Sequence, residues 1–130
     1  MKIRTFACLL VIASLAGCAS NSEQQQLELL AKNRASLLSG ELPLEAGPLS
    51  IMRANAKGST IEIMMVYNQD QAGAKPIEQV MNNGLNYYCS NQETKANLDA
   101  GLSYRLKMRN TRGQLMLDQF VTKQSCTTQR

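Results

Sequence analysis

Residues 102–109 read LSYRLKMR, so that apolar and polar side chains alternate along the whole stretch. Because successive side chains of a β-strand point to opposite faces of a sheet, this pattern predicts a strand with one apolar and one mostly basic face. The sequence NTRG at residues 110–113 is typical of a turn, and residues 114–122 have the composition of a returning strand. These two strands are expected to pair as a hairpin in the C-terminal part of the chain.

A second hairpin is predicted earlier in the chain. Residues 59–67 read STIEIMMVY and are rich in the β-branched and aromatic side chains that favour strands. The preceding residues 55–58, NAKG, are typical of a turn in which glycine adopts a positive φ at little cost. Residues 49–54 are then expected to be the partner strand.

Two helices are predicted beside these hairpins. Residues 76–90 carry an apolar stripe at helical spacing, and Pro76 suits the first helical position. Gly84 lies within this stripe and is expected to let another backbone approach closely, because it has no side chain. Residues 22–39 carry a second apolar face at helical spacing. Residues 91–100 are expected to be a loop with a short helical turn.

The first residues of the chain have the form of a secretory signal. Lys2 and Arg4 precede an apolar run of eleven residues, which is too short to span a membrane, because a spanning helix takes about 20. The run ends in LAGC at residues 15–18, which resembles the lipobox of bacterial lipoproteins. That resemblance implies cleavage before Cys18 and acylation of its thiol and amino group. Two or more acyl chains anchor a protein stably in a membrane.

The order helix, hairpin, helix, hairpin predicts an α+β fold. We expect an antiparallel sheet built from the two hairpins, with room for one further strand, and two or more helices packed on it. Residues 1–17 are assigned to the lipoprotein signal peptide and residues 18–26 to the acylated N-terminus and a polar tether. Residues 27–130 are expected to fold as a single α+β domain, which suits their length.

Composition excludes several classes of function. The chain has no histidine, which removes the Ser-His-Asp triad, the Cys-His pair and the commonest general base. No glycine-rich phosphate-binding loop is present. Cleavage before Cys18 leaves 113 residues with a side-chain charge of about +2, spread along the chain rather than clustered as in nucleic-acid binders. We therefore expect no enzyme, no nucleic-acid partner and no cofactor other than the covalent lipid on Cys18.

The remaining cysteines predict one disulfide. Cys8 leaves with the signal and Cys18 receives lipid, so that Cys89 and Cys126 form an even pair in an oxidising compartment. Closing this loop of about 38 residues stabilises a fold by about 4 kcal/mol on the chain-entropy model. Two cysteines without a histidine make a poor zinc site, so no metal is expected.

Several predicted strands carry apolar residues on both faces, which has two explanations. One helix could cover each face of the sheet, or strand ends could turn inward. Alternatively, one face could form a groove for an apolar segment of a partner protein, and the six methionines of the mature chain would suit such a surface. On the second explanation, the candidate partner-binding residues are Met64, Val66, Met116 and Phe120.

The polar face of the strand at residues 102–109 also has two interpretations. Arg105, Lys107 and Arg109 form a basic row on it. Such a row is most often a solvated sheet face, which is the interpretation that we favour. The row could instead contact an acidic partner or anionic headgroups.

The order of several short sequences is similar to one known family. Besides the lipobox, these sequences are LLAK at 29–32, LPL at 42–44, GST at 58–60, YC at 88–89, GLSY at 101–104, NTRG at 110–113 and the terminal Cys126. Together they resemble the GspS-beta (AspS-type) pilotins of type II secretion systems over essentially all of the mature chain. The chain does not look like the other pilotin class, which is an all-helical bundle.

The resemblance implies a function that composition does not show. Pilotins of this family are lipoproteins of the outer membrane, on its periplasmic face, and they bind the C-terminal segment of the secretin channel. The lipoprotein-sorting machinery carries the pair to the outer membrane, where the secretin assembles. The family's acylated cysteine corresponds to Cys18 and its cysteine pair to Cys89 and Cys126. Ala19 agrees with this destination, because aspartate at that position usually signals retention in the inner membrane.

This function needs no catalysis, and a monomer is expected, because no feature of the sequence suggests an obligate oligomer. The alternative function is that of a periplasmic inhibitor or an envelope-binding lipoprotein. In that case the basic row would matter more than an apolar face, and binding would weaken steeply with salt.

Overall fold

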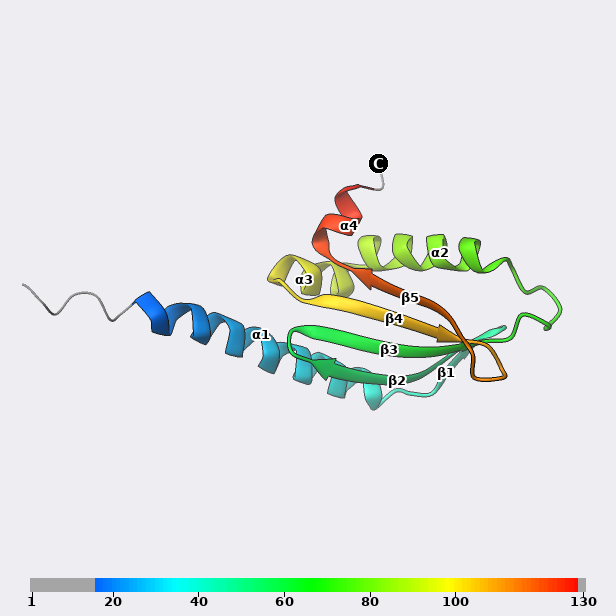
Figure 1. Cartoon of the computed structure of the whole chain (residues 1–130), viewed down its shortest axis with the longest axis horizontal. Coiled ribbons are helices and arrows are strands. Elements are labelled where there is room, and N and C mark those ends of the chain that lie inside the picture. Colours follow the sequence, from blue (N-terminus) through cyan, green and yellow to red (C-terminus); the bar gives the residue numbers. More distant parts are fainter. Residues whose placement is uncertain (1–15, 129–130) are drawn as a thin grey trace, which may run out of the picture.

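The computed structural model describes residues 16–128, and the side chains of residues 21–128. The predicted signal peptide therefore lies almost wholly outside the described residues. The chain forms α1 (Ala16–Ser39), β1 (Leu44–Ala46), β2 (Leu49–Lys57), β3 (Thr60–Tyr67), α2 (Ile77–Ser90), α3 (Gln92–Ala100), β4 (Ser103–Arg109), β5 (Leu115–Val121) and α4 (Lys123–Thr127) (Figure 1). Within the described range, no helix has the length and apolar character needed to cross a membrane.

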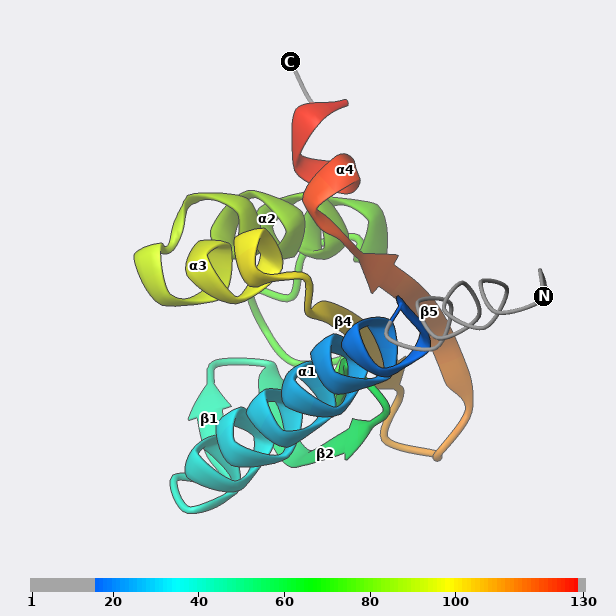
Figure 2. The same cartoon turned by 90° about the vertical axis from the view of Figure 1, so that its left-hand side faces the viewer.

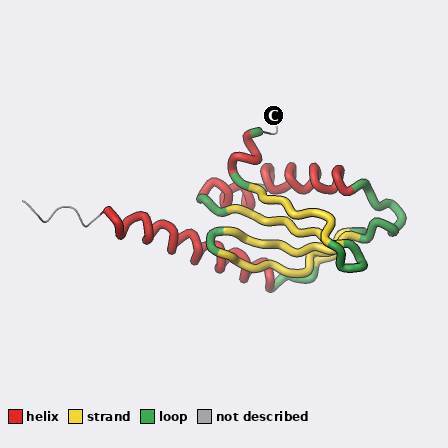
Figure 3. Tube along the Cα trace, in the orientation of Figure 1, coloured by secondary structure: helices red, strands yellow, loops and turns green. Residues whose placement is uncertain are grey.

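The five strands form one sheet in the order β1-β2-β3-β4-β5 (Figure 3). The α+β class and both predicted hairpins, β2–β3 and β4–β5, are confirmed, and β1 is the further strand that was allowed for. The sheet is mixed rather than wholly antiparallel, because β3 and β4 pair in parallel. The reason is the connection between them: α2 and α3 carry the chain back to the end of the sheet where β3 begins, so that β4 starts there too.

One face of the sheet holds the core. Along β3 and β4 every second side chain is buried, as the alternating sequence of residues 102–109 predicts. A fully buried side chain of this size stabilises the fold by about 1.5–3 kcal/mol relative to an exposed one. The buried side chains of the two strands are Ile61, Ile63, Met65, Tyr67, Tyr104, Leu106 and Met108.

All the long helices pack on this one face, so the prediction of one helix on each face is wrong (Figure 2). Ala31 and Ala35 of α1 are buried in the same cluster as the core side chains of β3 and β4. Val80 and Tyr88 of α2 pack against that cluster as well. Within residues 16–128, no helix covers the opposite face, which is called the open face below.

Several boundaries differ from the predictions, and side-chain caps account for those of α3 and α4. The backbone of α1 is already helical at Ala16, so the helix begins earlier than the predicted residue 22 and includes residues 18–26. The side chain of Asn91 accepts hydrogen bonds from two backbone N–H groups of α3, which is a full helix rather than one turn. Thr122 and Ser125 form a capping box that begins α4, a helix that the sequence analysis did not predict.

The predicted disulfide is confirmed. Cys89 in the last turn of α2 is bonded to Cys126, and the two Cα atoms lie 5.4 Å apart. Cys126 belongs to α4 rather than to an irregular tail of the last strand. The bond holds the C-terminal end of α2 against the segment that follows β5, and so fixes the position of α2 over the sheet.

Candidate partner-binding groove

A cavity of about 370 Å³ opens on the covered side of the sheet, beside α2. Its floor is the core face of the sheet, its wall is α2, and its far end is formed by β1 and the start of β2. We call it the groove. The floor includes Met65, Tyr67, Leu106, Met108 and Leu117, the wall includes Val80, Met81, Gly84, Tyr87 and Tyr88, and the far end includes Ala46, Pro48, Leu49 and Ile51.

The wall of the groove has a gap at Gly84, because glycine has no side chain. A Cβ atom at Gly84 would have no neighbour within 4 Å apart from the adjacent residues and the backbone of α2 itself. Among the described residues, no backbone from another element approaches Gly84, so the close approach expected there is not made within the chain. No residue of α2 is fully buried, although the helix carries a continuous apolar stripe. Part of that stripe thus faces an accessible space rather than a filled core.

Three tyrosines, Tyr67, Tyr87 and Tyr88, line the groove. The hydroxyl of Tyr67 donates to the backbone oxygen of Lys75 and accepts from the backbone N–H of the same residue, both at 2.7 Å. These bonds hold the loop before α2 at one end of the groove. Burial raises the pKa of Tyr88, whose ring packs 4.8 Å from that of Tyr104, so this phenol stays neutral. Tyr87 packs edge-on against Tyr88 and is 57% exposed.

The four residues predicted to bind a partner do not line the groove. Met64 and Val66 alternate with the buried residues of β3 and so lie on the open face, and Phe120 of β5 lies opposite Arg105 on that face. Met116 is the additional residue where the β4–β5 register shifts. Their role in partner binding stays a prediction, and the groove is formed by other residues.

The sequence could not single out the residues of the groove. Those of α2, β3 and β4 follow the same periodic patterns as core residues, and they were interpreted as core. A periodic pattern identifies an apolar side chain but not whether another part of the chain covers it. The one local signal was Gly84 inside the α2 stripe.

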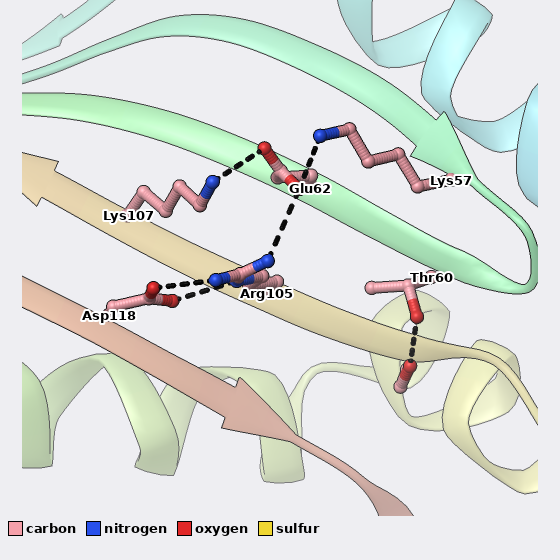
Figure 4. Close-up of polar contacts among 7 residues, drawn as sticks. Lys57, Thr60, Glu62, Arg105, Lys107 and Asp118 are labelled. Atoms are coloured by element: carbon pink, nitrogen blue, oxygen red, sulfur yellow. Dashed lines mark hydrogen bonds and ion pairs between the residues drawn. The ribbon is translucent and has the colours of Figure 1, made fainter.

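The open face carries a network of ion pairs (Figure 4). Glu62 lies 3.1 Å from the ammonium of Lys107 and 3.5 Å from that of Lys57. Arg105 makes two hydrogen bonds, at 2.8 and 2.7 Å, to the carboxylate of Asp118. Two of the three residues of the basic row are thus paired with acids on neighbouring strands. This pairing favours the interpretation of a solvated sheet face.

The network lowers the pKa of both carboxyl groups. Partial burial alone would raise the pKa of Glu62, but the hydrogen bond from Lys107 and the charges of Lys107 and Lys57 outweigh it and lower the pKa. The hydrogen bonds from Arg105 hold the pKa of Asp118 below its usual range. The guanidinium of Arg105 also lies 5.1 Å from the centre of the Phe120 ring, a cation–π contact.

Comparison with known proteins identifies the family. The family described as "Type II secretion system (T2SS) pilotin, S protein" matches residues 23–126, which include every strand and the disulfide. The chain belongs to the type II secretion pilotins. This pilotin is similar to the solved type II secretion pilotin AspS of Vibrio cholerae, with 63% identity and a TM-score of 0.78 over 83% of this chain and 99% of that one.

Two further relatives support the assignment. The solved pilotin EpsS of the Vibrio vulnificus type 2 secretion system is 46% identical, with a TM-score of 0.78 over 82% of this chain and 96% of that one. "Lipoprotein YghG" of Escherichia coli K12 is 24% identical over 104 residues, which are 80% of this chain and 75% of that protein. The resemblance to the AspS-type pilotins is thereby confirmed.

The lining of the groove is mostly apolar. Its titratable lining side chains are a lysine and three tyrosines, so among the described residues it holds no carboxylate that could act as a general base. The described part of the chain also has no group of three side chains suited to a metal ion. What the groove offers a ligand is apolar surface, with an open wall at Gly84 where a backbone could approach.

Proposed function

We propose that this pilotin binds the C-terminal segment of its secretin in the groove and directs the secretin to the outer membrane. The observation that carries the proposal is the apolar cavity of about 370 Å³ between α2 and the sheet. A helical segment with an apolar face suits such a surface, because groove-binding helices insert side chains at regular helical spacing. The gap at Gly84 would allow the backbone of the segment to lie close to α2.

The lipid anchor completes the proposed function. The backbone of Cys18 belongs to α1, which continues without a break to Ser39 and extends beyond the sheet (Figure 1). An acylated Cys18 would place the lipid at the free end of this helix, away from the groove. Several acyl chains on one cysteine hold a protein in a membrane without further contacts. The lipoprotein-sorting machinery would then carry the bound secretin to the periplasmic face of the outer membrane.

Calorimetric titration tests the binding step. The mature chain with Cys18→Ser, which prevents acylation, is titrated with a peptide from the C-terminal tail of the host's secretin. We expect saturable one-to-one binding with a negative heat-capacity change, because apolar surface is buried. Absence of binding by the folded, oxidised protein would refute the proposal.

The alternative function has less support. An inhibitor or an envelope-binding lipoprotein would use the basic row, but Arg105 and Lys107 already pair with Asp118 and Glu62. Breaking these pairs to bind a new anion would offset part of the energy gained.

A further inference from the structure

Lys75 is the single charged residue among the described residues that line the groove. It lies in the loop between β3 and α2, two positions before the first residue of that helix, and it is exposed. Within residues 21–128, no carboxylate oxygen lies within 4.0 Å of its ammonium nitrogen. This ammonium is therefore an accessible positive charge at the edge of an apolar space.

The floor of the groove fixes the backbone of Lys75. The side chain of Tyr67 is buried, and its hydroxyl both donates to the backbone oxygen of Lys75 and accepts from the backbone N–H. These bonds use main-chain atoms of Lys75, so another side chain at this position would leave them intact. A charge on a fixed backbone loses less conformational freedom on binding than a charge on a mobile loop.

Lys75 marks one end of the groove, where α2 begins. At the same end, the backbone N–H of Asn68 donates to the backbone oxygen of Pro48, the residue before β2. Tyr87 lies about 15 Å further along the axis of α2 than Ile77, because an α-helix rises about 1.5 Å per residue. In Figure 1 the loop before α2 and the last turn of that helix accordingly lie at opposite ends of the helix. The groove thus has a positive charge at one end and an exposed aromatic ring at the other.

The acidic residues in the segments around this end are directed away from the groove. Glu78 is about 160° around the axis of α2 from Val80, which lines the groove, because each residue turns about 100°. Glu45 precedes Ala46 of the lining in β1, so its side chain points to the other face of the sheet. Asp70 lines a separate polar cavity beside the turn between β4 and β5. A segment in the groove would therefore meet the charge of Lys75 rather than that of a neighbouring acid.

We propose that Lys75 binds a carboxylate of the secretin segment, so that the part of the segment with this carboxylate lies where α2 begins. This inference rests on the proposed function. Apolar contacts alone accept a helix in either direction, because the hydrophobic effect is not directional. A charge at one end distinguishes the two directions, because electrostatic complementarity fixes the register of a complex. The carboxylate belongs either to an acidic side chain or to the C-terminus of the segment.

The test compares Lys75→Gln with Lys95→Gln in the mature chain with Cys18→Ser. Lys95 is an exposed cation of α3, which has no described residue in the lining of the groove, so its replacement controls for net charge. We expect Lys75→Gln to weaken binding of the secretin C-terminal peptide about three- to fivefold at low salt, as for an exposed ion pair. Lys95→Gln should stay within about twofold. Circular dichroism checks that each variant is folded.

Two further variants and a change of salt separate the charge of Lys75 from the space that it occupies. Lys75→Arg keeps the charge and should bind within about twofold of the unmodified protein. Lys75→Glu reverses the charge and should bind more weakly than Lys75→Gln, because like charges repel. The difference between Lys75→Gln and the unmodified protein should nearly vanish at about 1 M salt, where the Debye length is about 3 Å.

Peptide variants identify the source of the carboxylate and the direction of the segment. One peptide has an amidated C-terminus, and each of the others carries glutamine or asparagine in place of one acidic residue. One of them should lose affinity for the unmodified protein and lose little for Lys75→Gln, which is the signature of a direct pair. The position of the changed residue in that peptide shows which end of the segment lies at Lys75.

The outcomes distinguish this inference from the proposed function. Equal affinity of Lys75→Gln and the unmodified protein would overturn the inference and leave the proposed function intact. An equal loss in Lys95→Gln would also overturn the inference, because the effect would then come from net charge. Absence of binding by the unmodified protein would overturn both.

Discussion

Two substitutions of Gly84 test the stability of the fold and the binding of a partner in the groove separately. Gly84 lies within α2, lines the groove, and has no neighbour within 4 Å of the position that a Cβ atom would take. Gly84→Ala should therefore stabilise the protein by about 0.5–1 kcal/mol, because glycine in a helix interior costs that much relative to alanine. For a chain of this length, the melting temperature should rise by roughly 4 °C.

Gly84→Leu keeps the helix-forming advantage but places a large side chain in the groove. A partner backbone that packs against Gly84 would then be overpacked, which typically costs about 1–3 kcal/mol. Affinity for the secretin C-terminal peptide should consequently fall by about 5- to 150-fold. Thermal unfolding followed by circular dichroism gives the stability, and calorimetric titration gives the affinity.

Asn82→Ala is the matched control, because Asn82 is an exposed residue of α2 outside the groove. It should gain helix stability and leave peptide affinity unchanged. A folded Gly84→Leu protein that binds the peptide as tightly as the unmodified protein would refute the placement of the partner in the groove. A loss of stability in Gly84→Ala would show that the space beside Gly84 is filled.

The remaining predictions concern the disulfide and the open face. Replacing Cys89 and Cys126 together by serine should cost about 4 kcal/mol, as measured by urea unfolding, and reduction of the unmodified protein should give the same loss; a loss under about 1 kcal/mol would contradict the chain-entropy reasoning. The pKa values of Glu62 and Asp118 are below their ordinary values of 4.5 and 3.8, so the unfolded chain binds more protons in that range. The stability that these groups contribute is present above about pH 4.5 and lost as the pH falls through their folded pKa values. In Glu62→Gln, the free energy of unfolding should fall less steeply as the pH is lowered. An unchanged pH dependence would argue against the ion-pair network. Alanine at Met64 and at Phe120 should leave peptide binding unchanged if the groove is the binding site, whereas weaker binding by a folded variant would place the partner on the open face.

Local patterns were sufficient for most of the elements. The alternation of residues 102–109 predicted which side chains of β4 would be buried, because a strand exposes successive residues to opposite faces. The pairing of Cys89 with Cys126 followed from the count of cysteines left in the mature chain. Gly58 adopts a positive φ of 58° in the first hairpin, as its turn sequence predicted.

The arrangement of the elements in space did not follow from those patterns. The apolar stripe on α2 indicates that the helix packs against an apolar surface. It does not indicate which face of the sheet provides that surface or how much of the stripe is covered. The placement of α1 and α2 on one face left the other face open, so the four predicted partner-binding residues and the groove came to lie on different surfaces.

The sequence by itself therefore determined the α+β class, the two hairpins, the disulfide and the buried face of the strand at residues 102–109, because each depends on residues close together or on simple counting. Tertiary structure alone decided the parallel pairing of β3 with β4 and the groove beside Gly84. These depend on the free energy of packing between elements far apart in the chain, and the periodicity of any one element contains no information about that energy.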